Sequence, residues 1–147
     1  MSCIRFNTPA QRKQMAAMAP SMLTPEEAAS LHPAPPVTDS KIARLRLLAQ
    51  DPNPKIRERV ALDYHTPDDV MEVLATDPDL GVRSCVARNE RVSCYVLENL
   101  ARDSSEVVRG HVALNFYVPE NAMKQLAEDP SAIVRGLVSW KTQLSRI

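Results

Sequence analysis

Glycine and aromatic residues are scarce in this 147-residue chain. Three glycines are too few for a glycine-rich loop that lets the backbone approach a phosphate closely, so we expect no bound nucleotide and no other cofactor. Aromatic residues make up 4% of the sequence and hydrophobic residues 44%, so we expect a core of Val, Leu, Ile, Ala and Met.

Cysteine is also scarce, and its spacing does not suit a metal site. A structural zinc site needs two closely spaced pairs of ligands, but Cys85 and Cys94 are nine residues apart and Cys3 is far from both. We therefore expect reduced thiols, as in a cytoplasmic protein, and no metal ion.

Charge and hydropathy exclude further classes of protein. Basic and acidic residues number 18 each, so the net charge of zero predicts no general attraction to nucleic acid or to an anionic membrane. No segment approaches the ~18 apolar residues of a membrane-spanning helix. The apolar segment 15–22 is interrupted by Pro20 and Ser21, so it is a poor signal peptide. We expect a cytoplasmic protein.

The main feature of the chain is a repeat of 26 residues. Six columns align across four sequence units without a gap: Leu, Ala, Asp, then Ile or Val, then Arg, then Val. The leucines that mark the units are Leu48, Leu74, Leu100 and Leu126. A fixed period of this size is typical of a solenoid, in which each unit buries its apolar face against its neighbours. We predict an all-α repeat domain over residues 41–147.

Each unit is predicted to contain two short helices. In the first unit, Asp51 is expected to cap a helix that has Pro52 in its first turn. Ile56 and Val60 are four residues apart, so they share the inward face of this helix, which is expected to end near Leu62.

A turn and a second helix are predicted to follow in each unit. The expected turn residues are Asp63, Asn89 and Asn115, which occupy the same repeat position. Pro67 and Pro119 are expected to mark the start of second helices. The residues expected to face inward there are Val70, Met71 and Leu74, with Val96, Leu97, Leu100, Ala122, Met123 and Leu126 as their equivalents. Helices of about ten residues are unstable alone, so the units must stack.

The two ends of the chain depart from the repeat. Residues 1–40 are expected to form a helical N-terminal extension, with helices near 9–18 and 24–31 and a Pro-rich connector over 32–36. This extension is either a mobile arm or, as we favour, a cap on the first unit. In the last unit Trp140, Leu144 and Ile147 either fold back over the end or leave an apolar end for a partner.

The repeat resembles a known family. Residues 74–83 read Leu-Ala-Thr-Asp-Pro-Asp-Leu-Gly-Val-Arg, and over about residues 41–140 this pattern resembles the leucine-rich repeat variant family. The resemblance implies a right-handed α-solenoid of about four units, each pairing an α-helix with a second short helix that is often 3₁₀. The period of 26 is longer than the family's unit, and an α-helix in the second place would resemble HEAT repeats more closely.

The resemblance implies a fold rather than an activity, because the functions of the family are poorly defined. Some members carry a cysteine-rich iron–sulfur module before the repeats. Only Cys3 precedes the repeats here, so we expect no such cluster.

An Asp and an Arg stand six residues apart in every unit. The pairs are Asp51 and Arg57, Asp77 and Arg83, Asp103 and Arg109, and Asp129 and Arg135. The four arginines could bind phosphates. We favour a structural ladder, in which each Asp accepts backbone N–H bonds at a helix start and pairs with the Arg of the next unit, because each Arg adjoins a buried Val column that packs its stem. HEAT-like repeats use a similar ladder.

Positions that vary between units are the better candidates for binding. One column contains Arg59, Cys85, His111 and Leu137, and another contains Leu62, Arg88, Leu114 and Trp140. These columns could line a groove or could be ordinary solvated surface. We take Arg59, Arg88, His111 and Trp140 as candidate partner-binding residues.

Charge is arranged in two blocks. Residues 41–59 contain six basic and two acidic residues, and residues 60–80 contain six acidic residues and no basic one. Such blocks suit a polar partner or self-association, or they neutralise each other between stacked units.

We hypothesise a non-enzymatic scaffold or adaptor of bacterial type that binds a protein or peptide. A homodimer through the C-terminal end is a further hypothesis. The alternative is a HEAT-like solenoid that binds nucleic acid through the basic N-terminal repeat. A third hypothesis, a minimal enzyme, has little support, because His32, His65 and His111 belong to no recognisable catalytic motif.

Overall fold

The computed structural model describes residue 13, residues 30–31 and residues 36–144. The chain divides into two parts, Met1–Pro36 and Val37–Ile147. Residues 13, 30 and 31 are helical, and the rest of the helices predicted near 9–18 and 24–31 lies outside the described residues, as do most of the connector over 32–36 and Ile147. The fold described below is that of residues 37–144.

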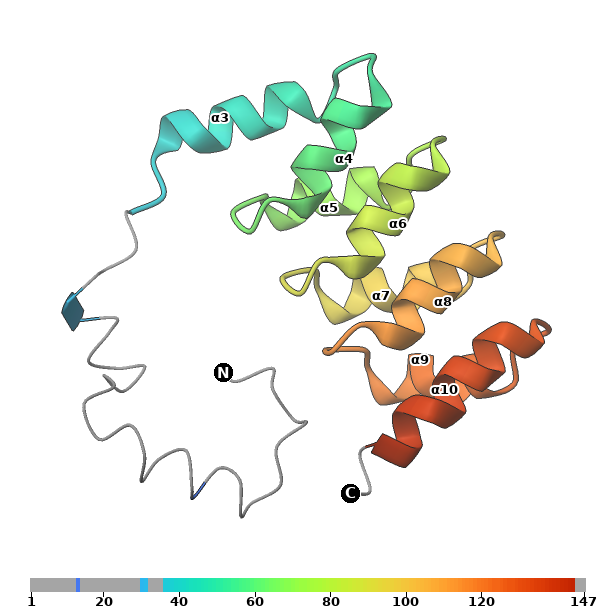
Figure 1. Cartoon of the computed structure of the whole chain (residues 1–147). Helices are drawn as coiled ribbons and strands as arrows, with labels where there is room; N and C mark the ends of the chain where they lie inside the picture. The colour runs from blue at the N-terminus through green and yellow to red at the C-terminus, as the bar shows by residue number, and fades with distance from the viewer. Residues whose placement is uncertain (1–12, 14–29, 32–35, 145–147) are drawn as a thin grey trace. The chain divides into compact units, whose positions relative to one another are not determined.

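These residues form helices and no strand, so the all-α prediction is confirmed for this part of the chain. The helices are α3 (Asp39–Leu48), α4 (Pro54–Leu62), α5 (Asp68–Leu74), α6 (Leu80–Arg88), α7 (Cys94–Leu100), α8 (Glu106–Leu114), α9 (Glu120–Ala127) and α10 (Ala132–Leu144). Helices α4, α6, α8 and α10 begin 26 residues apart, and so do α5, α7 and α9. The sequence period is therefore the spacing of helix starts (Figure 1).

The helix caps lie two residues later than predicted. Asn53 caps α4, because its side-chain oxygen accepts the N–H of Lys55 at 3.0 Å, and Pro54 occupies the first turn. The prediction of Asp51 as the cap and Pro52 in the first turn is therefore wrong. Asp51 instead accepts the N–H of Asn53 at 2.8 Å, an Asx turn that leads the chain into the helix.

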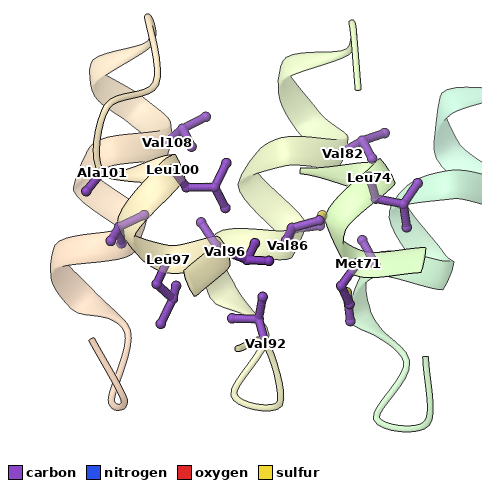
Figure 2. Packing of buried hydrophobic residues seen from close by; sticks show 14 of the residues in the cluster. Met71, Leu74, Val82, Val86, Val92, Val96, Leu97, Leu100, Ala101 and Val108 are labelled. Carbon is purple, nitrogen blue, oxygen red and sulfur yellow. The ribbon is translucent and has the colours of Figure 1, made fainter. Parts of the chain in front are cut away.

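The core is a continuous row of aliphatic side chains between stacked helices. Helix α4 contacts α6, α6 contacts α8, and α8 contacts α10. Figure 2 shows the repeat inside this core, where the pair Leu74 and Val82 recurs as Leu100 and Val108. All four side chains are at most 2% exposed, and full burial of each contributes about 1.5–3 kcal/mol relative to exposure. The inward positions predicted for the second helices are confirmed, although Met123 is only partly buried.

Three Arg–Asp pairs join consecutive units at the turns before the first helices. Arg57 pairs with Asp77, Arg83 with Asp103, and Arg109 with Asp129, each with 2.7 Å between Nε and Oδ2. Each Asp is thus held by the Arg of the preceding unit, and not by the Arg of the next unit as predicted. The hydrogen bond from Arg109 lowers the pKa of Asp129, which also accepts the N–H of Ser131.

Each Arg of this ladder also binds the turn of its own unit. Nη1 of Arg83 donates to the carbonyl of Asp77 at 2.7 Å, and Nη1 of Arg109 donates to the carbonyl of Asp103 at the same distance. One guanidinium therefore connects two successive turns. Both partners of each pair are largely buried, and a planar, bidentate contact of this kind is strong and geometrically specific.

A second ladder joins the opposite ends of the same helices. Nδ2 of Asn115 donates to the carbonyls of Ala87 and Asn89 at 2.8 and 3.0 Å, and Asn89 makes the equivalent bonds to Ala61 and Asp63. These bonds satisfy carbonyls that a helix end leaves without an intrahelical partner. The predicted turn role is also present, since Asn115 Oδ1 accepts the N–H of Tyr117.

In α10 the same repeat position is occupied by Lys141. Its Nζ donates to the carbonyl of Ala113 at 3.0 Å and to that of Asn115. Burial lowers the pKa of this ammonium group. Lys141 thus continues the asparagine ladder with a longer side chain.

The ladder predicts a specific pattern in a double-mutant cycle. Arg109→Met should lower the free energy of unfolding by about 3–5 kcal/mol, because it leaves the carboxylate of Asp129 buried without its cation. Asp129→Asn, added to Arg109→Met, should recover part of this loss, because an amide retains the acceptor for Ser131 without the charge. Urea denaturation of the two variants measures the difference.

Arg102→Met is the matched control, since Arg102 is exposed and outside the ladder. It should change stability by less than about 0.5 kcal/mol. Equal losses for Arg109→Met and Arg102→Met would show that the ladder contributes nothing.

Candidate functional site

The C-terminal ends of α4, α6 and α8, with the loops that follow them, lie along one side of the helix stack (Figure 1). Of the five aromatic residues in the described part of the chain, four are at this edge and exposed: Tyr64 (62%), Phe116 (54%), Tyr117 (42%) and Trp140 (52%). Leu62 and Leu114, also exposed, stand at the repeat position of Trp140. We call these six residues, with Arg88 and Arg91, the aromatic edge.

Local structure explains why these side chains face solvent. Each loop begins with an Asp or Asn in extended conformation that ends the helix and bonds to the backbone N–H two residues on. In the loops after α6 and α8 the same Asn side chain also binds the preceding unit. The fold thus uses Asn89 and Asn115 to join the units, and the next residues after Asn115, Phe116 and Tyr117, are exposed.

Neighbouring loops of the edge touch through ring contacts. The guanidinium of Arg91, after α6, lies 4.7 Å from the ring centroid of Tyr64, after α4. Such a cation–π contact contributes about 0.5–1 kcal/mol at an exposed site. These two residues line a depression of about 290 Å³ that also includes Val37 and Pro67.

A second depression, of about 260 Å³, contains two of the predicted binding residues. Arg88 and His111 line it together with Glu90, Leu114, Asn115 and Phe116. Among the described residues, Nδ1 of His111 is the one buried side-chain N or O atom that has no hydrogen-bond partner. Burial lowers the pKa of His111, and the charge of Arg88 lowers it further, so the imidazole is neutral at pH 7.

The four predicted binding residues fall in two places. Arg88 and His111 share one depression, and Trp140 lies on the same edge. Arg59 is elsewhere, in a larger depression between α3 and α4 that also includes Lys41 and Arg44.

Two members of the column that contains Arg59, Cys85, His111 and Leu137 do not line a groove. Cys85 is only 8% exposed and belongs to the core, and burial raises the pKa of its thiol. Leu137, in the same column, packs against Gly110, where an added Cβ would lie 3.3 Å from Leu137 Cδ1. Cys85 and Leu137 thus lie at the contact between successive first helices, whereas Arg59 and His111 of the same column each line a depression.

The two charge blocks neutralise each other within the chain. Lys41 pairs with Asp63 at 3.2 Å, Arg46 pairs with Asp69, and Arg57 is bonded to Asp77 in the ladder. The sequence left open a polar partner, self-association or neutralisation between stacked units. The structure contains ion pairs of the last kind.

Sequence reasoning missed Tyr64, Arg91, Phe116 and Tyr117. A signal for them was present, because Tyr64 and Phe116 occupy one repeat position, directly after the turn residue. In a chain with so few aromatic residues, two of them in one variable column indicate a surface rather than a core.

The depression around His111 predicts a pH-dependent stability. The folded state lowers the pKa of His111, so below about pH 6.5 the unfolded state binds more protons and stability falls as pH falls. His111→Leu, which has the residue of the equivalent position Leu137, should reduce this fall, as should Arg88→Gln. Urea midpoints between about pH 7.5 and pH 5.5 measure it, since these values bracket the ordinary pKa of histidine. If His111→Leu has the same pH dependence as wild type, this assignment is wrong.

Other classes of site are not found in the described residues. No group of three or more His, Cys, Asp or Glu side chains there could hold a metal ion. None of the helices formed by these residues is long and apolar enough to cross a bilayer. Cys85 and Cys94 are free thiols. Comparison of the chain with protein-family models, with curated proteins and with solved structures finds no match.

Proposed function

We propose that this chain is a non-enzymatic scaffold that binds a protein or peptide along the aromatic edge. The observation that supports this most is the gathering of four of the five described aromatic side chains at one edge, all of them exposed. Aromatic residues and arginine are the residue types most enriched in protein interfaces and in their hot spots. Tyr95 is the one other exposed Phe, Tyr or Trp among the described residues.

The proposal includes a fold and a location. We take residues 41–147 as a right-handed α-solenoid of about four units, related to the leucine-rich repeat variant family, in the cytoplasm. The equal spacing of helix starts and the two ladders support a repeat architecture. The second helices α5, α7 and α9 are α-helical, which brings the chain closer to HEAT repeats than a 3₁₀ segment would.

The size of the depressions favours a polypeptide over a small molecule. At about 290 and 260 Å³, each falls below the usual range of about 300–1,000 Å³ for a ligand pocket. Each is large enough for one or two side chains of a partner. One depression lies at the loops after α4 and α6, and the other lies at the loops after α6 and α8. An extended segment that anchors a side chain in each would therefore cross from one loop to the next.

The polar groups beside the depressions define the chemistry of the partner. Arg88 and Arg91 supply guanidinium donors suited to carboxylates and backbone carbonyls. His111 also lines the second depression. A segment with aliphatic or aromatic anchors and an acidic residue between them fits this arrangement. A second copy of the chain, bound through the C-terminal end, is the other partner we consider.

The nucleic-acid alternative has less support. It relied on the basic N-terminal repeat, but Lys41, Arg46 and Arg57 are held in ion pairs with acidic residues. The guanidinium groups of three ladder arginines likewise donate hydrogen bonds to aspartates and carbonyls; these residues are Arg57, Arg83 and Arg109. Of the six basic residues in 41–59, Arg44 and Arg59 form no ion pair with another described residue.

Variants of the aromatic edge test the proposal. Phe116→Ser and Trp140→Ser should each weaken capture of the specific partner from a host lysate by about tenfold or more, because truncating an aromatic hot spot costs about 2 kcal/mol. The tagged chain is used in pull-downs, with each lysate divided into nuclease-treated and untreated halves. Both variants should keep the wild-type urea midpoint, since both side chains are exposed.

Tyr95→Ser and Val73→Ser are the matched controls. These side chains are 64% and 65% exposed, on the second helices α7 and α5, away from the edge. A protein caught equally by all four variants would contradict the proposed surface. A protein recovered only from the untreated half would favour nucleic acid, and its capture should then weaken steeply with salt.

A further inference from the structure

The contact between two successive first helices has a fixed composition. At the junction of α8 with α10, the earlier helix contributes Arg109 to the ladder and a face of small residues, Gly110 and Ala113, both buried. The later helix contributes Leu137 against Gly110, and the turn before it contributes Asp129. The junction of α6 with α8 has the same design, with Ser84 and Ala87 as the small buried residues.

Helix α10 has the same face of a ladder Arg and small residues on the side away from α8. The described residues contain no further helix that packs on this face. Gly136 and Ser139 occupy the positions of Gly110 and Ala113 but are exposed, and an added Cβ at Gly136 would meet nothing within 4 Å. Nη1 of Arg135 binds the carbonyls of Asp129 and Pro130, as the other ladder arginines bind their own turns. No Asp among the described residues pairs with its remaining N–H groups.

The other end of the stack, at α4, has the complementary face, which consists of a ladder Asp and apolar side chains. Asp51 makes the same Asx turn as the other ladder aspartates, but no Arg in the described part of the chain pairs with it. Ile56 and Leu48 are only partly buried, whereas their equivalents Val82 and Leu74 are almost completely buried. These apolar residues form the floor of a depression of about 590 Å³, whose rim includes Arg59.

We propose that these two ends bind each other between copies of the chain, so that α10 of one copy packs on α4 of the next. Arg135 of one copy then pairs with Asp51 of the next, as Arg109 pairs with Asp129 within the chain. Gly136 receives the stem of Arg59, because the position of Arg59 in the repeat is that of Leu137, the side chain against Gly110. The depression between α3 and α4 is covered by the face of α10.

The asparagine ladder changes at this contact. Asp63 stands at the repeat position of Asn89, but its carboxylate cannot donate a hydrogen bond. Nζ of Lys41 lies 3.2 Å from this carboxylate and supplies N–H donors beside it. The contact joins two different surfaces, so it is heterologous and each added copy leaves one free end of each kind. The product is a row of copies, and it leaves the aromatic edge exposed along its length.

Charge exchange at the two ends tests this assembly. In sedimentation velocity of the full chain, the mean mass of the wild type should rise with protein concentration beyond that of a dimer. Asp51→Arg and Arg135→Asp should each weaken self-association by about tenfold or more, because each places like charges opposite one another. An equimolar mixture of the two variants should associate again, because Arg135 of the first variant meets Asp51 of the second.

Two further variants keep the test independent of folding. Arg102→Asp makes the same change in net charge as Arg135→Asp, at an exposed arginine outside the ladder, and should leave association unchanged. Gly136→Gln should preserve or raise thermal stability, because a helix gains from losing an interior glycine and the side chain has open space. It should nevertheless block association, because the added side chain fills the place of the Arg59 stem.

Three outcomes would overturn the proposal. The first is a wild-type chain that stays monomeric at every concentration, as it would if another part of the chain occupied the N-terminal end. The second is a mixture of Asp51→Arg and Arg135→Asp that does not regain association. The third is a dimer that both charge variants retain and Trp140→Ser abolishes, which would show a symmetric contact through the C-terminal end.

Discussion

Each internal junction of this protein depends on one guanidinium that is bonded to two turns at once. Arg83 donates to a carbonyl of its own turn and, through Nε, to the carboxylate of Asp103 in the next. Helices of seven to nine residues, such as α5 and α6, are not stable alone, so each must be held against its neighbours. The Arg–Asp pair sets the distance and register between units, and the Val and Leu columns are buried as a consequence.

The asparagine ladder makes the opposite edge available for function. By satisfying the helix-end carbonyls of the preceding unit, Asn89 and Asn115 complete the hydrogen bonding of each loop with one side chain. The residues at the next two positions of each loop take no part in this ladder, and they differ between units. The exposed aromatic residues occur at these positions and at the helix ends beside them, which is why binding and folding draw on different residues.

The two proposals use separate surfaces for the same reason. Ion pairs join three basic residues of the first sequence block to three acidic residues of the second, and binding along the aromatic edge rests on rings and a few guanidinium groups. At the ends of the stack, by contrast, Asp51 and Arg135 are members of the ladder whose counterparts are supplied by no described residue. The ladder that fixes each internal junction is therefore also a means of joining copies.

The sequence by itself determined the all-helical fold of residues 37–144, the 26-residue spacing of helix starts and the inward columns. The spacing of apolar residues and the Pro, Asn and Asp residues that mark helix starts and turns all act within one unit. The sequence placed the helix caps two residues early, since Asp51 and Asn53 are both capable caps and only the backbone path distinguishes them. Only the tertiary structure decided that each Asp pairs with the preceding Arg, that Cys85 is buried, and that Arg88 and His111 share a depression without Arg59. These features depend on the offset between stacked helices, because this offset sets where side chains of different units meet. The repeat period alone does not specify the offset.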